Sequence, residues 1–169
     1  MPTNDLTYAN YATIDKNNKI TGKRTVGYAE DILLDNVVKA CFLYKRKVHQ
    51  SLDGYAPDLF LVEDYDYWIR AAKAGFRFKP IYEVLYHYRF HQGSLTEKRR
   101  KDISKALLHL LESHAEQIDM KFINAKVYLR MANLYRAHSL KKRARKFAFK
   151  AALMNFKVLF SKTFYKAFL

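Results

Sequence analysis

The distribution of glycine and proline constrains the fold of this chain more than any other feature. All five Gly and all three Pro lie before Thr96, and none occurs from there to residue 169. Both residues disfavour helix interiors, so their absence favours a long helical region. Apolar residues in that region also recur at helical spacing, namely Ile103, Ala106, Leu107, Leu110 and Leu111. The sequence therefore predicts two parts, a mixed domain over residues 1–97 and a basic α-helical region over 98–169.

Within the helical region, residues 124–156 are similar to one tetratricopeptide repeat, a helix–turn–helix unit. The residues near the signature positions of that repeat are Tyr128, Ala132, Tyr135, Ala144, Ala151 and Phe156. A single repeat cannot bury its own apolar faces. We therefore expect a helical hairpin that packs on the preceding helix, which Thr96 can cap.

Residues 1–97 carry signals for both strands and helices, which predicts an α+β or α/β fold. Residues 5–36 are expected to be rich in loops. Aromatic and β-branched runs predict strands, and glycine is typical of helix ends. The expected elements are a hairpin over 14–22, a buried strand over 37–46, a short helix over 47–55 stopped at Gly54, a helix over 65–74 ended by Gly75, and two strands over 76–91 around Pro80.

The chain is strongly basic, with 31 Lys and Arg against 16 Asp and Glu and a formal charge of +15. Such a charge attracts polyanions, including nucleic acid, anionic lipid and phosphorylated substrates. The charge is uneven, because residues 139–169 contain no acidic residue while the first hundred residues hold most of the acids. A basic C-terminal region beside a more ordinary domain is therefore expected.

Three features of the sequence bear on its compartment. No apolar run approaches the roughly 18 residues needed to span a bilayer. The first residues are polar and form no apolar signal segment. The single cysteine, Cys41, cannot form an internal disulfide, which fits a reducing compartment. The sequence thus predicts a cytoplasmic protein.

The segment LVEDYDYWIR, residues 61–70, places Glu63, Asp64 and Asp66 at the expected start of a helix. Asp64 suits the N-cap position, where helix N–H groups stabilise its ionised form. Such a carboxylate can accept a proton from a hydroxyl group. Asp64-Tyr65-Asp66 also has the form of a D-x-D metal motif, but residues two apart do not share a helix face. The alternative is that these acids are ordinary residues of a helix N-terminus and have no chemical function.

A second polar segment, YHYRFHQGS over residues 86–94, lies on an expected strand. Strand alternation places His87, Arg89 and His91 on one face and aromatic residues on the other. Arg89 and His91 beside a Gly-Ser turn can hold a diphosphate or help to ligate a metal. The alternative is that they are ordinary polar residues of an edge strand.

The order and spacing of motifs over about residues 5–97 resemble the C-terminal half of the catalytic domain of family 2 glycosyltransferases, inverting enzymes with the GT-A fold. The motifs that carry the resemblance are Tyr44-Lys45-Arg46, Gly54-Tyr55-Ala56, Glu63 to Trp68 followed by Arg70, and Tyr88, Arg89, His91 and Ser94. The stretch YANYATIDKNNK (8–19) is similar to the family's Tyr-rich strand and the turn after it. The resemblance therefore implies a partial GT-A fold.

The resemblance also implies a role for each matching residue. Asp64 corresponds to the catalytic base, which deprotonates a sugar hydroxyl as that hydroxyl attacks a nucleotide-sugar donor. Glu63 and Trp68 would contact the acceptor, a glycan or lipid-linked glycan of bacterial cell-surface polysaccharide synthesis. Mg²⁺ or Mn²⁺ is the expected cofactor of the complete enzyme. The residues expected at the donor diphosphate or in a lid are Arg89, His91 and Ser94.

The family's nucleotide-binding half, with its D-x-D metal motif, has no counterpart in this sequence. We therefore expect the chain to be a fragment, one part of a split gene or a degenerate relative, with a separate nucleotide-binding half as its partner. By the same comparison the metal site is not encoded here, and His91 is the one candidate ligand.

The last residues, FKVLFSKTFYKAFL over 156–169, alternate Lys with Phe, Tyr and Leu at nearly helical spacing. This pattern suits a helix lying on an anionic membrane surface, which would place the protein peripherally on the inner face of the cell membrane. Docking of the same helix against the domain is the alternative. The rival functions are a nucleic-acid-binding module and a helical interaction protein without catalysis. Nucleic acid is disfavoured because no recognised binding motif is present.

Overall fold

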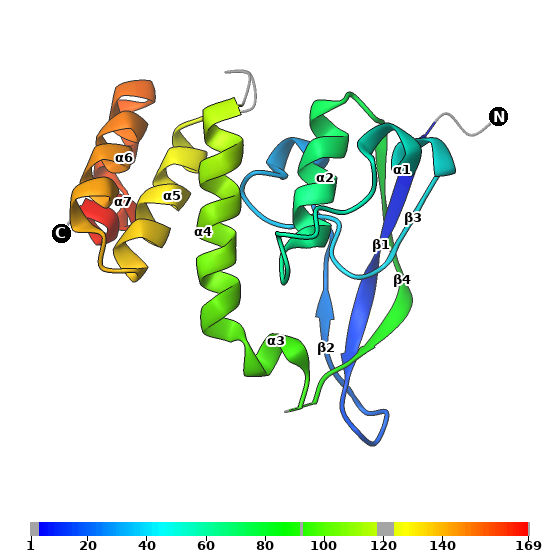
Figure 1. Cartoon of the computed structure of the whole chain (residues 1–169). Coiled ribbons are helices and arrows are strands. Elements are labelled where there is room, and N and C mark those ends of the chain that lie inside the picture. The colour runs from blue at the N-terminus through cyan, green and yellow to red at the C-terminus, as the bar shows by residue number, and fades with distance from the viewer. Residues whose placement is uncertain (1–3, 92, 118–123, 169) are drawn as a thin grey trace. The chain divides into compact units, whose positions relative to one another are not determined.

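The structure is a computed structural model that describes residues 4–91, 93–117 and 124–168 (Figure 1). The chain divides into two compact units, residues 1–100 and 101–169. Unit 1 holds all of the described strands, and unit 2 is helical in its described residues. The protein is therefore mixed, with an α+β unit followed along the chain by a helical one.

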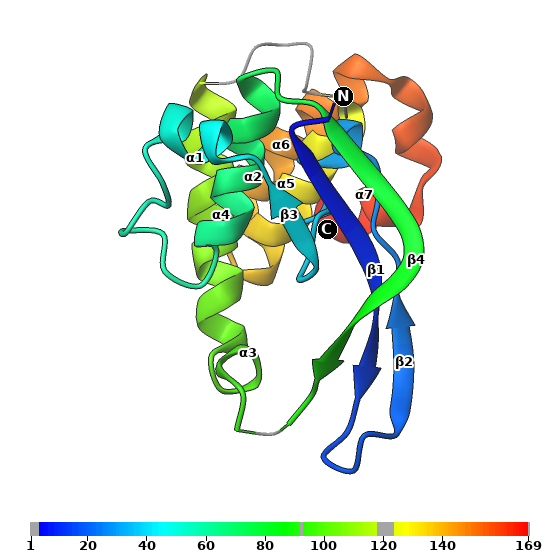
Figure 2. The same cartoon turned by 90° about the vertical axis from the view of Figure 1, so that its right-hand side faces the viewer.

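A four-stranded sheet forms the frame of unit 1 (Figure 2). β1 (Leu6–Ile14) pairs in parallel with β4 (Phe78–Arg89) along one edge. Along its other edge β1 pairs in antiparallel fashion with β2 (Ile20–Arg24) and β3 (Phe42–Tyr44). Most of β1 is buried, whereas β4 is largely exposed. The sheet is thus mixed, and β1 is its buried centre.

Two predictions about strands are wrong in extent. Residues 5–36 contain fewer loop residues than expected, because β1 (nine residues) and β2 (five residues) occupy 14 of the 32 positions. The buried strand expected over 37–46 shortens to β3, whose Leu43 is 75% exposed. Val37 and Val38 are buried in the turns before β3 instead. The apolar run therefore belongs to a buried turn and not to a buried strand.

β4 runs unbroken through Pro80, where two strands were expected. It pairs with β1 alone among the described strands, so it is an edge strand. An edge strand tolerates proline because its outward side needs no N–H donor. The hairpin expected over 14–22 is confirmed, since the Asp15 N–H donates to the Lys19 carbonyl across the turn (3.0 Å).

Glycine ends both helices of unit 1 that follow β3. α1 (Arg46–Leu52) stops at Asp53 and Gly54, whose φ angles are 53° and 73°. α2 (Glu63–Lys73) stops before Gly75, whose φ of 78° lies in the left-handed region that favours glycine. These helix ends confirm the prediction from the sequence.

The start of α2 differs from the prediction. Val62 occupies the N-cap position, and Asp64 lies inside the first helical turn rather than at its cap. From this start the helix turns its apolar face into unit 1. The residues that it buries are Tyr65, Asp66, Tyr67, Trp68, Ile69 and Ala71.

Two short elements complete unit 1. η1 (Ala29–Asp31) is a single 3-10 turn. α3 (Leu95–Lys98) begins at Ser94, whose hydroxyl oxygen accepts a hydrogen bond from the Glu97 N–H (3.4 Å). Thr96, which the sequence suggested as the cap of the helix containing Ile103 and Leu111, lies inside α3 instead, and that longer helix begins at Arg100.

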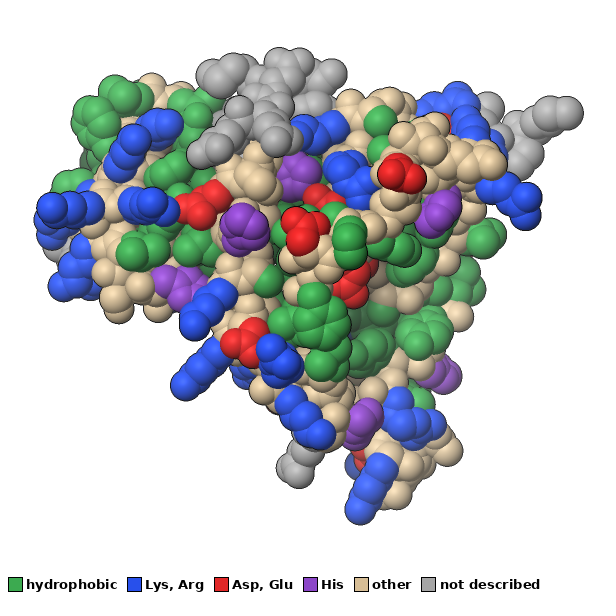
Figure 3. Space-filling view, viewed as in Figure 1, with side chains coloured by type: hydrophobic (Ala, Val, Ile, Leu, Met, Phe, Trp, Pro, Cys, Tyr) green, Lys and Arg blue, Asp and Glu red, His purple; other side chains and the backbone are tan. Residues whose placement is uncertain are grey.

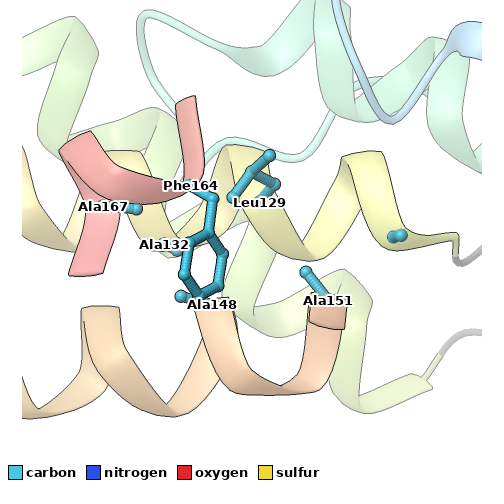
Figure 4. Packing of buried hydrophobic residues seen from close by; sticks show 7 residues of the cluster. Leu129, Ala132, Ala148, Ala151, Phe164 and Ala167 are labelled. Atoms are coloured by element: carbon cyan, nitrogen blue, oxygen red, sulfur yellow. The ribbon is translucent and has the colours of Figure 1, made fainter. Parts of the chain in front are cut away.

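Unit 2 is built around the predicted helical hairpin, which is confirmed. The helices are α4 (Arg100–Gln117), α5 (Ala125–Ala137), α6 (Lys141–Met154), the 3-10 turn η3 (Phe156–Phe160) and α7 (Lys162–Phe168). Small side chains let α5, α6 and α7 approach one another closely, and the ring of Phe164 lies among them (Figure 4). The buried cluster consists of Ala125, Leu129, Ala132, Ala148, Ala151, Phe164 and Ala167.

Polar contacts join the hairpin to α4. Glu112 Oε1 accepts hydrogen bonds from the Tyr135 hydroxyl (2.6 Å) and from Arg143 (2.8 Å). Ser104 Oγ lies 3.0 Å from His138 Nε2. These contacts confirm that the hairpin packs on the preceding helix. Among the described residues, no helix is both long enough and apolar enough to cross a membrane.

Candidate active site

The first turn of α2 contains the carboxylate that the sequence singled out as a base. Asp64 Oδ1 accepts a hydrogen bond from the Tyr65 N–H (2.6 Å), and Oδ2 accepts one from the Asn36 side-chain amide (3.1 Å). Asn36 is itself fixed, because its Oδ1 accepts the Lys39 N–H (3.1 Å). The half-buried Asp64 carboxylate is therefore held in one orientation by two donors.

The pKa of the Asp64 carboxyl is raised above its ordinary value. Burial is the main cause because the charged form loses hydration, and the nearby charge of Glu63 acts in the same direction. The hydrogen bonds from Tyr65 and Asn36 oppose the rise by stabilising the ionised form. A carboxylate with a raised pKa binds a proton more readily than an ordinary aspartate does, which suits a general base.

Asp66, two residues further along α2, has a different environment. Its Oδ2 pairs with Arg70 Nε at 2.6 Å, and its side chain is 5% exposed. Arg70 also donates hydrogen bonds to the carbonyls of Leu52 (2.7 Å) and Gly54 (2.9 Å). This network ties α2 to the end of α1. Asp64 and Asp66 thus have separate partners, as the helical spacing predicts.

Glu63 lies next to Asp64 in the same turn. Its Oε2 is buried and has no hydrogen-bond partner among the described residues. A buried carboxylate oxygen without a donor is costly, so a ligand hydroxyl that donates to it would be stabilising. The residue predicted to contact an acceptor therefore has one buried oxygen that lacks a donor within the described residues.

Two tyrosines contact each other beside α2. The Tyr55 ring, 38% exposed, lies 4.6 Å from the Tyr67 ring. Burial is the main cause of the raised pKa of Tyr55, and the Tyr44 hydroxyl and the charge of Asp64 act in the same direction. Burial also raises the pKa of Tyr67 to about 12. Both hydroxyls keep their protons near neutral pH and can donate hydrogen bonds.

Trp68, which was predicted to contact the acceptor, lies in the core. It has no exposed surface, and its ring lies 4.7 Å from Phe42 and 5.0 Å from Tyr67. A fully buried indole cannot stack on a ligand that arrives from solvent. The exposed ring of Tyr55 is better placed for that contact.

The residues predicted for the donor diphosphate, Arg89, His91 and Ser94, are not brought to the first turn of α2. Arg89 donates to the Asp15 carbonyl (2.7 Å) and to Asn18 Oδ1 (2.6 Å). It therefore fastens the end of β4 to the β1–β2 turn, where the two lie together in Figure 1. Ser94 caps α3. Among the described residues, no hydrogen bond or ion pair joins these three side chains to Glu63 or Asp64.

Asn36 is the residue of the site that sequence reasoning missed. It lies 28 positions before Asp64 and meets that carboxylate only through the fold of unit 1. An asparagine between LLD and VVK is typical of a turn, and nothing in that pattern indicates a partner. Tyr55 carried a weak signal, because it follows Gly54 in one of the quoted motifs.

Comparisons with family models, with curated proteins and with solved structures found no match for this chain. Within the described part of the chain, no group of three or more His, Cys, Asp and Glu side chains is placed to hold a metal ion. The arrangement that remains is a fixed, half-buried carboxylate, a neighbouring carboxylate oxygen without a donor, and an exposed tyrosine. Such a set can bind a hydroxyl group and accept its proton.

Proposed function

We propose that this chain supplies the acceptor-binding half of an inverting glycosyltransferase with the GT-A fold, and that Asp64 is its general base. The observation that carries the proposal is the Asp64 carboxylate, oriented by Tyr65 and Asn36 and with a pKa raised by burial. A base of this kind can take the proton of a sugar hydroxyl near neutral pH. The motifs on either side of α2 support the same class of reaction.

In the proposed reaction the acceptor hydroxyl binds at the Asp64 carboxylate. Its oxygen attacks the anomeric carbon of a nucleotide-sugar from the side opposite the diphosphate, and its proton passes to Asp64. The bond from the anomeric carbon to the diphosphate oxygen breaks, and the nucleoside diphosphate leaves with that electron pair. A single displacement inverts the anomeric configuration, so one base is sufficient.

Glu63 and Tyr55 position the acceptor in this proposal. Glu63 Oε2 accepts a hydrogen bond from a second sugar hydroxyl, which supplies the donor that the oxygen lacks within the described residues. The exposed ring of Tyr55 offers an apolar surface to the sugar, and its hydroxyl can donate to the same ligand. Two hydroxyl contacts and one ring contact would align the attacking oxygen with Asp64.

The donor is held by residues outside this sequence in the proposed enzyme. Arg89 is not assigned to the donor here, because its guanidinium contacts the β1–β2 turn. Mg²⁺ or Mn²⁺ would offset the diphosphate charge in the complete enzyme. The described residues offer no cluster that fits such an ion, so no step is assigned to it in this chain. A nucleotide-binding half is therefore the required partner.

The proposed acceptor is a glycan or a lipid-linked glycan of cell-surface polysaccharide synthesis. A lipid-linked acceptor would confine the reaction to the cytoplasmic face of a membrane. The chain would then act peripherally, at the level of the lipid head groups.

The proposal is tested by Asp64→Asn in the complete enzyme, which combines this chain with its nucleotide-binding half. The measurement is release of nucleoside diphosphate from a panel of nucleotide-sugars in the presence of membrane extract as acceptor. We expect the rate to fall by at least about 100-fold, because Asn keeps the shape of the side chain and cannot accept the proton. Asp58→Asn, which removes an exposed acid of the same unit, is the matched control and should keep the wild-type rate. Turnover of Asp64→Asn within a few-fold of wild type would contradict the base assignment.

A further inference from the structure

Unit 2 exposes a row of large apolar side chains where α6 ends and η3 begins. We name this row the C-terminal ridge. Figure 3 shows hydrophobic side chains gathered over the C-terminal end of α6, with Lys and Arg side chains along the same helix. The ridge residues are between 44% and 80% exposed and consist of Phe149, Leu153, Met154, Phe156 and Phe160.

The core of unit 2 does not use the C-terminal ridge. α6 turns alanines toward α5 and α7, and Ala144, Ala148 and Ala151 have no exposed surface. Phe149 and Leu153 are four residues apart and share the outward face of the same helix. Large apolar residues that cluster on the outside, while small ones fill the inside, indicate a surface that contacts another apolar phase.

Strong positive charge surrounds the C-terminal ridge. Residues 139–168 contain nine Lys and Arg and no Asp or Glu, and residues 101–169 carry fifteen Lys and Arg against four acids. The net charge of unit 2 is therefore +11 of the total of +15. Lys146, Lys157 and Lys162 are exposed beside the ridge in sequence. Apolar side chains flanked by lysine are the combination that binds the interface of an anionic bilayer.

We propose that unit 2 docks on an anionic phospholipid surface, with the C-terminal ridge inserted between head groups and the flanking lysines bound to lipid phosphates. A second copy of the chain fits the ridge poorly, because like surfaces would bring nine cations against nine. Nucleic acid would use the lysines but offers no apolar phase for Leu153 and Met154. Charge and apolarity together therefore select lipid. This inference does not depend on the proposed transferase activity.

A hollow elsewhere in unit 2 fits the same partner. It lies between α5 and α7 and has a volume of about 660 Å³. Leu129 and Leu134 contribute to its wall. Four cationic side chains also line it, namely Lys126, Arg130, Lys162 and Lys166, and the lining contains no acid. A hollow with an apolar wall and cationic sides can take a lipid phosphate together with the first part of its glycerol or acyl chain.

The test uses the full chain and sedimentation with lipid vesicles. Vesicles of phosphatidylcholine with about 30% phosphatidylglycerol should bind the chain, and vesicles of phosphatidylcholine alone should not. Phe156→Ser combined with Phe160→Ser should weaken binding to the anionic vesicles by about tenfold or more, because both rings leave water on insertion. Lys157→Gln combined with Lys162→Gln should weaken it as well, and added salt should reduce this second effect.

Matched controls come from unit 1. Leu43→Ser removes an apolar side chain that is as exposed as those of the ridge, and Lys16→Gln combined with Lys19→Gln removes two exposed charges. Both controls should bind anionic vesicles as the wild type does. Equal losses in the controls and in the unit 2 variants would overturn the proposal, because binding would then follow general charge or apolarity.

Three other outcomes would also overturn it. Unchanged binding of the Phe156→Ser, Phe160→Ser variant would mean that the rings do not enter the bilayer. Binding to polyuridylate with a steep salt dependence, and no binding to vesicles, would identify the basic surface as a nucleic-acid site. The wild type could instead form a dimer in sedimentation equilibrium, and the Phe156→Ser, Phe160→Ser variant could be monomeric. If neither protein bound vesicles, the C-terminal ridge would be a contact between two copies of the chain. None of these results bears on Asp64, whose role is measured by turnover.

Discussion

Two aspartates of unit 1, the buried Asp5 and the half-buried Asp64, have opposite environments. Asp5, just before β1, is nearly fully buried, and Lys45, Lys47 and Arg77 lie within ion-pair distance of its carboxylate. The closest pair is Lys47 Nζ with Asp5 Oδ1 at 2.6 Å, and the Arg77 N–H donates to Oδ2 (3.1 Å). These donors, with Lys47 first, hold the pKa of Asp5 far below its usual range.

Asp64, at the start of α2, is also largely shielded from water, but its side-chain donor is the neutral amide of Asn36. Burial therefore dominates and raises the pKa of its carboxyl. Asp5 and Asp64 therefore differ in the groups that compensate their charge. Asp5 is surrounded by cations and fastens the strand ends, which include the backbone of Lys45 and Arg77. Asp64 lacks such cations among the described residues and has a raised pKa, a property that is frequent at functional sites.

The largest effect is expected from Asp5→Ala, which should lower the thermal midpoint by several degrees. The substitution leaves three cations around an empty position and removes the acceptor of the Arg77 N–H. Asp5 has a lowered folded pKa, so its stabilisation is complete above the ordinary value of 3.8 and is lost as the pH falls toward the folded value. Thermal unfolding from neutral to acid pH should show the wild type converging on the variant. A constant difference across that range would contradict the electrostatic role.

Asp64→Asn should act in the opposite direction on stability. Asp64 has a raised folded pKa, so its contribution is favourable below the ordinary value of 3.8 and is lost as the pH rises through the folded pKa. Near neutral pH the variant removes a buried charge that no described cation offsets, and we expect it to be as stable as the wild type or more stable by on the order of 1 kcal/mol. Urea unfolding checks this, and the advantage should shrink in acid. A clear loss of stability at neutral pH would make Asp64 structural, as Asp5 is.

The sequence indicated α2 and its end because those features are local. Gly75 adopts the left-handed conformation two residues after Lys73, the last residue of α2, and the spacing of Asp64 and Asp66 follows from helix geometry alone. The unbroken β4 could not be foreseen in the same way. Pro80 interrupts a central strand but not an edge strand, and its place in the sheet depends on pairing with β1 from the other end of the unit.

The candidate site was predicted where the chain carried a motif and missed where it did not. Asp64 and Glu63 were found from their position before an aromatic helix, whereas Asn36 reaches Asp64 through the tertiary fold. Trp68 was predicted to contact a ligand because it belongs to a motif, but its position on α2 places the indole in the core. The contacts of Arg89 could not be predicted from the residues around it, because both of its partners lie in the distant β1–β2 hairpin.

A smaller effect is expected from Asn36→Ala, which probes the difference between the two aspartates directly. The substitution removes one of the two hydrogen bonds that stabilise ionised Asp64, so the pKa of Asp64 should rise further. It also frees the Lys39 N–H and should cost about 1 kcal/mol of stability. The measurement is a carbon-13 NMR titration of the Asp64 carboxyl carbon. Asn17→Ala in the exposed β1–β2 turn is the control and should leave that titration unchanged.

The smallest effect is expected from Lys45→Gln, which tests how the charge around Asp5 is shared. Lys45 Nζ lies 3.6 Å from Asp5 Oδ1 and its side chain is 43% exposed, so water and salt screen the pair. Lys47 lies closer, at 2.6 Å from the same oxygen, and its ammonium also lies 5.8 Å from the centre of the Phe76 ring. Lys47→Gln should therefore lower the thermal midpoint more than Lys45→Gln does, and the gap should narrow between about 0.05 M and about 0.5 M NaCl. Equal decreases of the thermal midpoint for the two variants would mean that all nearby cations stabilise Asp5 together. The difference between Asp5 and Asp64 would then come from the net local charge and not from the short Lys47 contact.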